Sequence, residues 1–197
     1  MSGLIKEILS ERTLNRIEES GASYKHAGVL MPLVMKDGVC CVLFTERTRK
    51  VEHHKGQISF PGGGVEEVDA SFGATAIREA QEEIGLSPND VDMLGRLDDT
   101  LTLVSNYLIH PFVGRIATET DFVLNRNEVE RVIYVPLSVF LTADREAMDH
   151  WVEYEGVRYR TNAYHYDGDV IWGATARIME NFVQIIGDNF PLHDVEQ

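Results

Sequence analysis

The sequence has very little cysteine and no long apolar run. Its two cysteines, Cys40 and Cys41, are neighbours within an apolar stretch, where a structural disulfide is unfavourable and buried free thiols are ordinary. No apolar run reaches the roughly 18 residues of a membrane-spanning helix, and no charged-then-apolar leader opens the chain. These absences argue against a disulfide scaffold, a secreted protein and a membrane protein, so we expect a cytoplasmic location.

Positive charge is also scarce. Lys and Arg together number 18 against 32 Asp and Glu, which gives a formal net charge of −14. An acidic surface repels polyanions, which argues against binding to nucleic acid or to an anionic membrane. A polyanionic small molecule would therefore have to meet local positive charge or a bound cation.

Internal repeats, low-complexity segments and linkers are absent too. Because 44% of the 197 residues are hydrophobic, the chain can form one sizeable core, and we expect a single domain over residues 1–197. Within it, residues 2–20 have the apolar spacing of an amphipathic helix. We expect this helix to pack on the main domain; a contact in a homodimer or a surface attachment is the alternative.

The stretch from Gly56 to Leu86 joins a glycine-rich turn directly to an acidic helix. Ser71 is a suitable N-cap, and Gly85 stands where a helix commonly ends. Apolar residues recur between them at helical spacing: they are Ala76, Ile77, Ala80 and Ile84. At about 100° per residue, acidic residues gather on another flank of this helix: they are Glu79, Glu82 and Glu83.

Three carboxylates in one patch repel each other unless a cation lies between them or one of them takes up a proton. Oxygen ligands suit a hard divalent ion, and Mg²⁺ commonly bridges protein carboxylates to substrate phosphates. Glu79, Glu82 and Glu83 are therefore candidate ligands of Mg²⁺ or Mn²⁺. The alternative is an acidic helix face exposed to solvent.

The same residues resemble the Nudix box of the Nudix hydrolases. Gly63, Asp69 and the segment REAQEEIGL, which begins at Arg78, follow this box from about residue 63 to residue 86. Two departures lie in the loop: Asp69 stands where the family has Glu, and eight residues rather than seven separate it from Arg78. The resemblance implies an α/β fold, namely an α/β/α sandwich with a curved mixed β-sheet between helices, and metal-dependent hydrolysis of a diphosphate.

A narrower resemblance covers roughly Tyr24 to Phe182. Three segments are similar to the coenzyme A pyrophosphatase branch of the family: LFTER at 43–47, HKGQISFPGG at 54–63 and IWGATARI at 171–178. Where that branch has an arginine four residues before the Gly-Gln pair, this chain has Glu52. The resemblance implies hydrolysis of coenzyme A or a derivative to 3′,5′-ADP and 4′-phosphopantetheine. The alternatives are hydrolysis of ADP-ribose or another nucleoside diphosphate derivative, and a nucleotide sensor without catalysis.

The resemblance also implies roles for individual acids. Glu79, Glu83 and Glu82 would hold one to three Mg²⁺ or Mn²⁺ ions, and Glu79 or Glu128 would accept the proton of the attacking water. Arg78 would orient a carboxylate through a salt bridge. For Glu128, an ordinary surface acid is the alternative.

Basic residues gather in one run, from Arg47 to Lys55, directly before the glycine-rich turn. Guanidinium and ammonium groups suit phosphate oxygens, so we expect this run to contact phosphate; a solvent-exposed loop is the alternative. The run and the turn together supply the candidate substrate-binding residues: Arg47, His54, Gln57, Gly62 and Gly63.

The rest of the chain is predicted to form further strands and two helices. One tyrosine of a C-terminal meander is a candidate for stacking on an adenine: the four are Tyr154, Tyr159, Tyr164 and Tyr166. Pro111 should place part of its strand at an edge or a bulge. A short helix should follow Pro136, and a longer one should run from Gly173 to about Gly187. The expected strands are 28–35 and 39–45 around an Asp-Gly turn, then 91–101, 107–116 and 129–135, then a meander at 151–154, 158–166 and 170–172.

Overall fold

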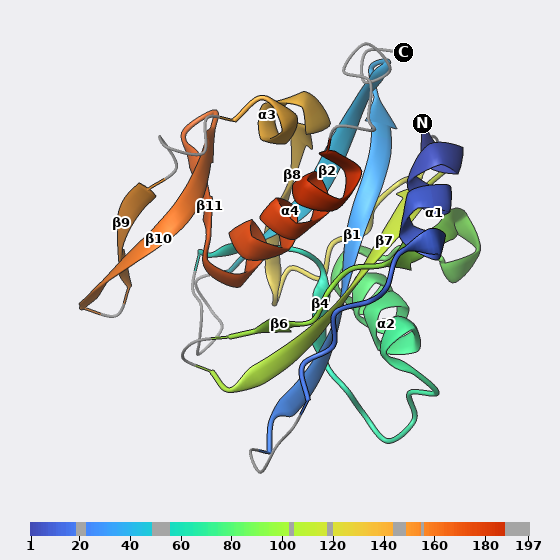
Figure 1. Cartoon of the computed structure of the whole chain (residues 1–197), viewed down its shortest axis with the longest axis horizontal. Helices are drawn as coiled ribbons and strands as arrows, with labels where there is room; N and C mark the ends of the chain where they lie inside the picture. The colour runs from blue at the N-terminus through green and yellow to red at the C-terminus, as the bar shows by residue number, and fades with distance from the viewer. Residues whose placement is uncertain are drawn as a thin grey trace.

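The computed structural model describes residues 1–18, 23–48, 56–102, 105–117, 120–143, 149–154 and 156–187. The α-helices among them are α1 (Ser2–Glu11), α2 (Phe72–Ile84), α3 (Leu137–Leu141) and α4 (Gly173–Ile186), with a 3-10 turn at Pro88–Asp90. The strands are β1 (Lys25–Lys36), β2 (Val39–Arg47), β3 (Ile58–Ser59), β4 (Gly62–Gly64), β5 (Val91–Arg96), β6 (Thr100–Leu101), β7 (Tyr107–Ile116), β8 (Val129–Pro136), β9 (Asp149–Tyr154), β10 (Val157–Tyr166) and β11 (Asp169–Trp172). Figure 1 shows their arrangement. No helix in the described ranges is long and apolar enough to span a membrane.

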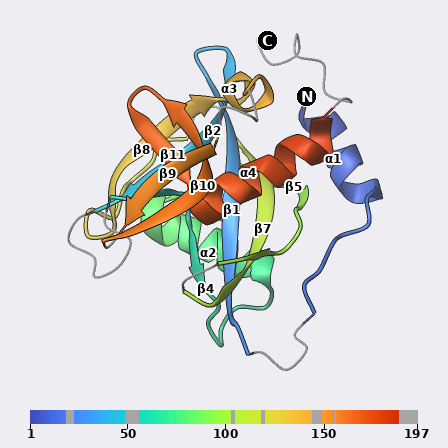
Figure 2. The same ribbon diagram turned by 60° about the vertical axis from the view of Figure 1, so that its left-hand side comes forward.

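Eight strands form one mixed sheet. Its main path is β3-β2-β1-β7-β5, with β4 also pairing with β1, β6 with β7 and β8 with β2. β1 and β7 are parallel, whereas the other pairs of the described strands are antiparallel. β9, β10 and β11 form an antiparallel meander that projects to one side of the main sheet (Figure 1, Figure 2). The mixed sheet is therefore confirmed.

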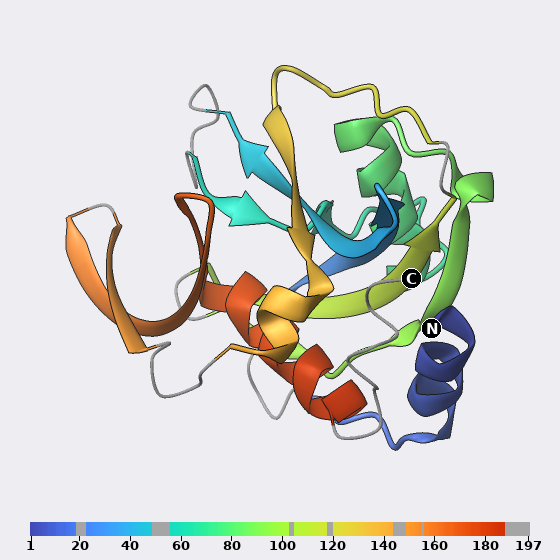
Figure 3. The same ribbon diagram turned by 90° about the horizontal axis from the view of Figure 1, so that it is seen from above.

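Helices cover both faces of the main sheet, as Figure 3 shows from above. On one face, the buried residues of α2 pack with Leu30 and Val34 of β1. On the other, α1, α3 and α4 share a core with Val29 and Met31 of the same strand. Successive side chains of a strand point to opposite faces, so β1, buried from residue 27 to residue 34, serves both cores. The α/β/α sandwich is confirmed.

The predicted Asp-Gly turn joins β1 to β2. Asp37 and Gly38 have φ values of 51° and 80°, the left-handed pair that a two-residue hairpin turn requires. The meander and α4 also lie where the sequence predicts them. The Asp-Gly pair therefore sets the boundary between β1 and β2.

Pro111 does not place β7 at an edge of the sheet, because β7 lies between β1 and β5. The neighbouring strand is interrupted instead: residues 97–99 divide the strand expected at 91–101 into β5 and β6. The Pro111 carbonyl accepts a hydrogen bond from the Leu97 N–H (2.9 Å). The Pro111 nitrogen therefore also faces the strand that contains β5 and β6. Since proline cannot donate to the ladder, the partner strand breaks where that bond would form.

α1 packs on the domain as predicted, but it is shorter than residues 2–20. Ile5 and Leu9 are buried in the core shared with α4. The helix ends before Arg12, whose backbone is extended and whose guanidinium pairs with Asp98. The predicted C-terminal end of this helix is therefore wrong. The pairing of Arg12 with Asp98 keeps the backbone extended where the sequence predicts that the helix continues. The apolar face of α1 is covered within one chain, so this helix gives no reason to expect a homodimer.

A buried polar cluster fixes the first turn of α2. The Phe72 ring stacks on His110, with 3.7 Å between ring centroids. The two nitrogens of His110 face His26 Nδ1 (2.9 Å) and Asp99 Oδ1 (2.8 Å). Burial is the main reason that the pKa of His110 lies below its ordinary value, with hydrogen bonding to Asp99 opposing it. The cluster joins β1, β7 and α2 beneath the glycine-rich turn.

Candidate active site

α2 begins and ends where the sequence predicts. The Ser71 side chain accepts a hydrogen bond from the Ala74 N–H (3.1 Å), and Gly85 takes the left-handed conformation that ends the helix. The helix lies directly on β1 at Gly28, where an added Cβ would be 2.3 Å from the Phe72 carbonyl oxygen. Glycine at this position lets the acidic helix approach the sheet closely, which sets its place beside the glycine-rich turn.

The glycine-rich turn contacts the acidic helix through Gly63. β4 pairs with β1, so that Gly63 lies opposite Gly28. A Cβ added at Gly63 would lie 2.5 Å from the carboxyl carbon and one oxygen of Glu79. The Glu79 carboxylate therefore rests against the Gly63 backbone, an approach that only glycine allows.

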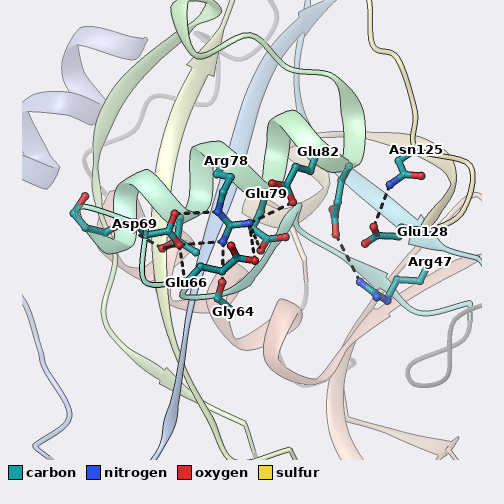
Figure 4. A network of polar contacts seen from close by, with 12 residues as sticks. Arg47, Gly64, Glu66, Asp69, Arg78, Glu79, Glu82, Asn125 and Glu128 are labelled. Carbon is teal, nitrogen blue, oxygen red and sulfur yellow. Dashed lines mark hydrogen bonds and ion pairs between the residues drawn. The ribbon is translucent and has the colours of Figure 1, made fainter.

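Arg78 is the centre of a network that ties the loop to the helix (Figure 4). Its guanidinium makes a two-point contact with Asp69, at 2.9 and 3.0 Å. It also donates to the Gly64 carbonyl (2.9 Å) and to the carboxylates of Glu79 (2.8 Å) and Glu82 (3.3 Å). Arg78 thus contacts two of the predicted acids; its role in orienting a catalytic carboxylate stays a prediction.

Asp69 takes the place of the family's glutamate within this network. Its side chain is only 3% exposed and also accepts hydrogen bonds from the Thr75 hydroxyl (2.9 Å) and the Glu66 N–H (2.9 Å). Hydrogen bonds from Arg78 hold the pKa of Asp69 well below its usual value. Asp69 therefore pairs with the Arg78 guanidinium although its side chain is shorter than that of glutamate.

Glu83 is the most buried acid of α2. It is 3% exposed, one carboxylate oxygen lies 3.6 Å from Arg47 Nη1, and the other has no hydrogen-bond partner among the described residues. Burial raises the pKa of Glu83 to about 8, although Arg47 opposes the shift. An unpartnered buried carboxylate oxygen is costly, and a cation would favour its charged form.

Glu128 comes from the turn before β8 and lies beside the acids of α2 (Figure 4). Asn125 donates to its carboxylate at 3.1 Å. Burial is the largest cause of the raised pKa values of Glu79 and Glu83, and the negative charge of Glu128 raises both further. The structure therefore brings Glu128 together with the helical acids, although about 45 residues separate them in sequence.

A cavity of about 370 Å³ opens beside the glycine-rich turn, between the main sheet and the start of α4. Four of the predicted substrate-binding residues line it, and the fifth, His54, lies outside the described residues: the four are Arg47, Gln57, Gly62 and Gly63. Sequence reasoning missed four further lining residues of suitable chemistry: Tyr107, Arg160, Trp172 and Arg177.

Neither Tyr164 nor Tyr166 of the meander lines this cavity, and the side chains of Tyr154 and Tyr159 lie outside the described part of the chain. Tyr164 is buried and packs edge-on against Phe140. Trp172 and Tyr107 are the aromatic residues at the cavity wall, together with Phe60. The resemblance of segment 171–178, which contains Trp172, is the sequence signal for this wall. The sequence does not show which side chains of the segment face the cavity.

Known proteins match both the sequence and the fold. The family model described as NUDIX domain matches residues 24–154. The chain is 34% identical over 165 residues to a protein from Pectobacterium atrosepticum named uncharacterized Nudix hydrolase NudL, covering 83% of this chain and 84% of the relative. A relative of the same name from Photorhabdus laumondii is 35% identical over 161 residues, covering 81% and 84%. The chain belongs to the Nudix family.

The fold of this Nudix hydrolase also matches solved structures. A MutT/nudix family protein from Enterococcus faecalis has a TM-score of 0.53 and 14% identity, covering 90% of this chain and 71% of that one. At this identity the likeness shows the fold alone. Family membership makes the chain a hydrolase that acts on pyrophosphate bonds.

The acids of this Nudix hydrolase fit the divalent metal ion that the family uses. The unpartnered, buried Glu83 oxygen and the neighbouring Glu79 carboxylate supply the hard oxygen donors that such an ion prefers. Among the described residues, however, no three acidic, histidine or cysteine side chains are already arranged around one ion position. Glu79 and Glu82 are paired with Arg78. The ligand set Glu79, Glu82 and Glu83 therefore stays a prediction.

Proposed function

We propose that this Nudix hydrolase cleaves the diphosphate of coenzyme A or a derivative, giving 3′,5′-ADP and 4′-phosphopantetheine. One observation carries the proposal: the three segments that resemble the coenzyme A pyrophosphatase branch all contribute to the wall of the same cavity, although the third lies more than 100 residues after the other two. Arg47 ends the first segment, Gln57 to Gly63 belong to the second, and Trp172 and Arg177 belong to the third.

The cavity meets the acidic cluster at two residues, Gly63 and Arg47. Gly63 lines the cavity and also contacts Glu79. Arg47 likewise lines the cavity and faces Glu83. A diphosphate that enters the cavity would therefore approach both the acids and a guanidinium, which can donate two hydrogen bonds to phosphate oxygens.

Each acid has a proposed role in the hydrolysis. Glu79, Glu82 and Glu83 would hold Mg²⁺ or Mn²⁺. The ion would neutralise negative charge on the diphosphate oxygens and lower the pKa of the attacking water. Glu79 or Glu128 would accept the proton of the attacking water. Arg78 holds Glu79 and Glu82 in place, and so acts through them and not on the substrate.

The test is a comparison of kcat/KM values with Mg²⁺ and with Mn²⁺ over a panel of diphosphates. The panel contains coenzyme A, ADP-ribose, nucleotide sugars and diadenosine polyphosphates, with the products identified by mass. We expect coenzyme A or its thioesters to give the highest value. A higher value for ADP-ribose would refute the coenzyme A assignment and leave a diphosphatase of other specificity. No turnover of any member would indicate a nucleotide sensor.

A further inference from the structure

The charge of the cavity wall is opposite to that of the protein. The whole chain has 32 acidic and 18 basic residues, yet the described residues that line the cavity include three arginines and no aspartate or glutamate: Arg47, Arg160 and Arg177. A concave wall of one sign concentrates counter-charged ligands. The cavity wall therefore favours an anionic ligand.

Arg177 has no carboxylate partner to neutralise it. Its guanidinium is half-buried and donates to the Leu101 carbonyl oxygen (2.6 Å), and no carboxylate of the described residues lies within 4.0 Å of it. Burial lowers its pKa, and the charge of Glu180 offsets this only in part. Partly burying a cation without an anionic partner is unfavourable, so an anionic ligand at Arg177 would stabilise this arrangement.

The other walls suit a flat, apolar group. Ile58, Ile109 and Ile178 line the cavity together with the aromatic residues Tyr107 and Trp172. Aromatic side chains of this kind stack on planar rings, and bases stack on them regardless of sequence. At about 370 Å³, the cavity is near the lower end of the usual range for ligand pockets, roughly 300–1,000 Å³. A cavity of this size can hold one half of a diphosphate-linked substrate.

We propose that this cavity binds the nucleotide half of the substrate and that Arg177, with Arg160, recognises a phosphate on its ribose, the 3′-phosphate in coenzyme A. Arg47 is engaged with Glu83 and so serves the diphosphate end, while Arg177 specifies the class of nucleotide, a nucleoside 3′,5′-bisphosphate. This inference rests on the proposed function, because it places one half of the proposed substrate.

Binding of product-like nucleotides tests this without turnover. Isothermal titration calorimetry on the full chain would compare 3′,5′-ADP with 5′-AMP, which differ only in the 3′-phosphate. We expect the wild type to bind 3′,5′-ADP about tenfold to a hundredfold more tightly. Arg177→Gln should remove most of this ratio. Arg177→Lys should restore part of it, because lysine keeps the charge but not the two-point geometry.

Kinetics supply a second readout and the control. With coenzyme A, Arg177→Gln should raise KM by a similar factor and change kcat little, since the lost contact is remote from the reacting diphosphate. The matched control is Arg115→Gln, which removes the same charge from an exposed arginine of β7 paired with Asp92; its nucleotide binding and KM should equal those of the wild type.

The outcomes separate this inference from the proposed function. The role of Arg177 would be overturned if Arg177→Gln left the ratio of the affinities for 3′,5′-ADP and 5′-AMP unchanged. It would also be overturned if Arg177→Gln and Arg177→Lys each weakened the binding of both nucleotides equally. Either result would stand even if coenzyme A is a good substrate. A ratio that depends on Arg177 would support the inference even if coenzyme A is not cleaved, in which case the proposed function alone fails.

Discussion

The contact between Gly63 and Glu79 makes a sharp prediction for Gly63→Ala. The new Cβ would lie 2.5 Å from the Glu79 carboxylate, whereas ordinary contacts begin at 3.4 Å, so the carboxylate must move by about 0.9 Å. Displacing a reacting group by about 1 Å can cost about a hundredfold in rate, which corresponds to about 2.7 kcal/mol of activation free energy. We therefore expect kcat/KM on a diphosphate substrate to fall by about two orders of magnitude.

The fold should survive this substitution. The displaced carboxylate weakens one hydrogen bond from Arg78, of 2.8 Å, and such a charge-assisted bond is worth up to about 1.5–3 kcal/mol. For a chain of this size, that lowers Tm by roughly 3–12 °C. A kinetic assay at 25 °C in saturating Mg²⁺ would then compare folded proteins.

Gly64→Ala is the matched control. Gly64 is the next residue of β4, and a Cβ added there would meet nothing within 4 Å. This variant should keep most of its activity, since its carbonyl still accepts from Arg78. If Gly63→Ala keeps more than about half of the wild-type kcat/KM, or if Gly64→Ala loses as much activity as Gly63→Ala, the close approach of Glu79 is not the reason that position 63 requires glycine.

Three further substitutions test other parts of the structure. Asp69→Asn should lower the free energy of unfolding by about 3 kcal/mol at neutral pH. Arg78 holds the pKa of Asp69 below its usual value. Urea unfolding should therefore show the difference between variant and wild type above about pH 4, and the difference should disappear as the pH falls further. Arg47→Ala should lower kcat/KM for every diphosphate substrate, since Arg47 faces Glu83; a loss confined to coenzyme A in the same assay would contradict this. Leu9→Ala should cost about 2–5 kcal/mol in thermal unfolding through the cavity it leaves in the core, with kcat at low temperature unchanged; a changed kcat would mean that α1 also acts on the site.

Local sequence signals predict the elements of this fold well. The Ser71 cap, the Gly85 stop and the Asp-Gly turn of β1 and β2 each depend on one or two residues whose preferences are intrinsic. The end of α1 and the break between β5 and β6 could not be found in this way. They depend on pairing of Arg12 with Asp98 and on the position of Pro111 within the sheet, which are long-range contacts.

The site is predictable to a similar degree. Helical spacing predicts one flank of α2 for Glu79, Glu82 and Glu83. In the structure Glu79 and Glu82 contact Arg78 (Figure 4), whereas Glu83 faces Arg47. Spacing alone does not show that Glu83 is buried with an unpartnered oxygen. The cavity wall is harder to predict, because Arg177 belongs to α4 and lines the same cavity as the glycine-rich turn only when α4 is packed on the main sheet.

The most direct test of the metal-dependent mechanism is the activity of Glu83→Gln in saturating Mg²⁺. The change keeps the shape of the side chain and removes the buried charge, with Glu66→Gln, an exposed acid near Arg78, as the control. We predict that Glu83→Gln loses several orders of magnitude in kcat, and that Mg²⁺ raises the Tm of the wild type but not that of the variant. If Glu83→Gln keeps more than about a tenth of wild-type turnover, a loss of less than about 1.4 kcal/mol in activation free energy, Glu83 is not a ligand of the catalytic metal ion.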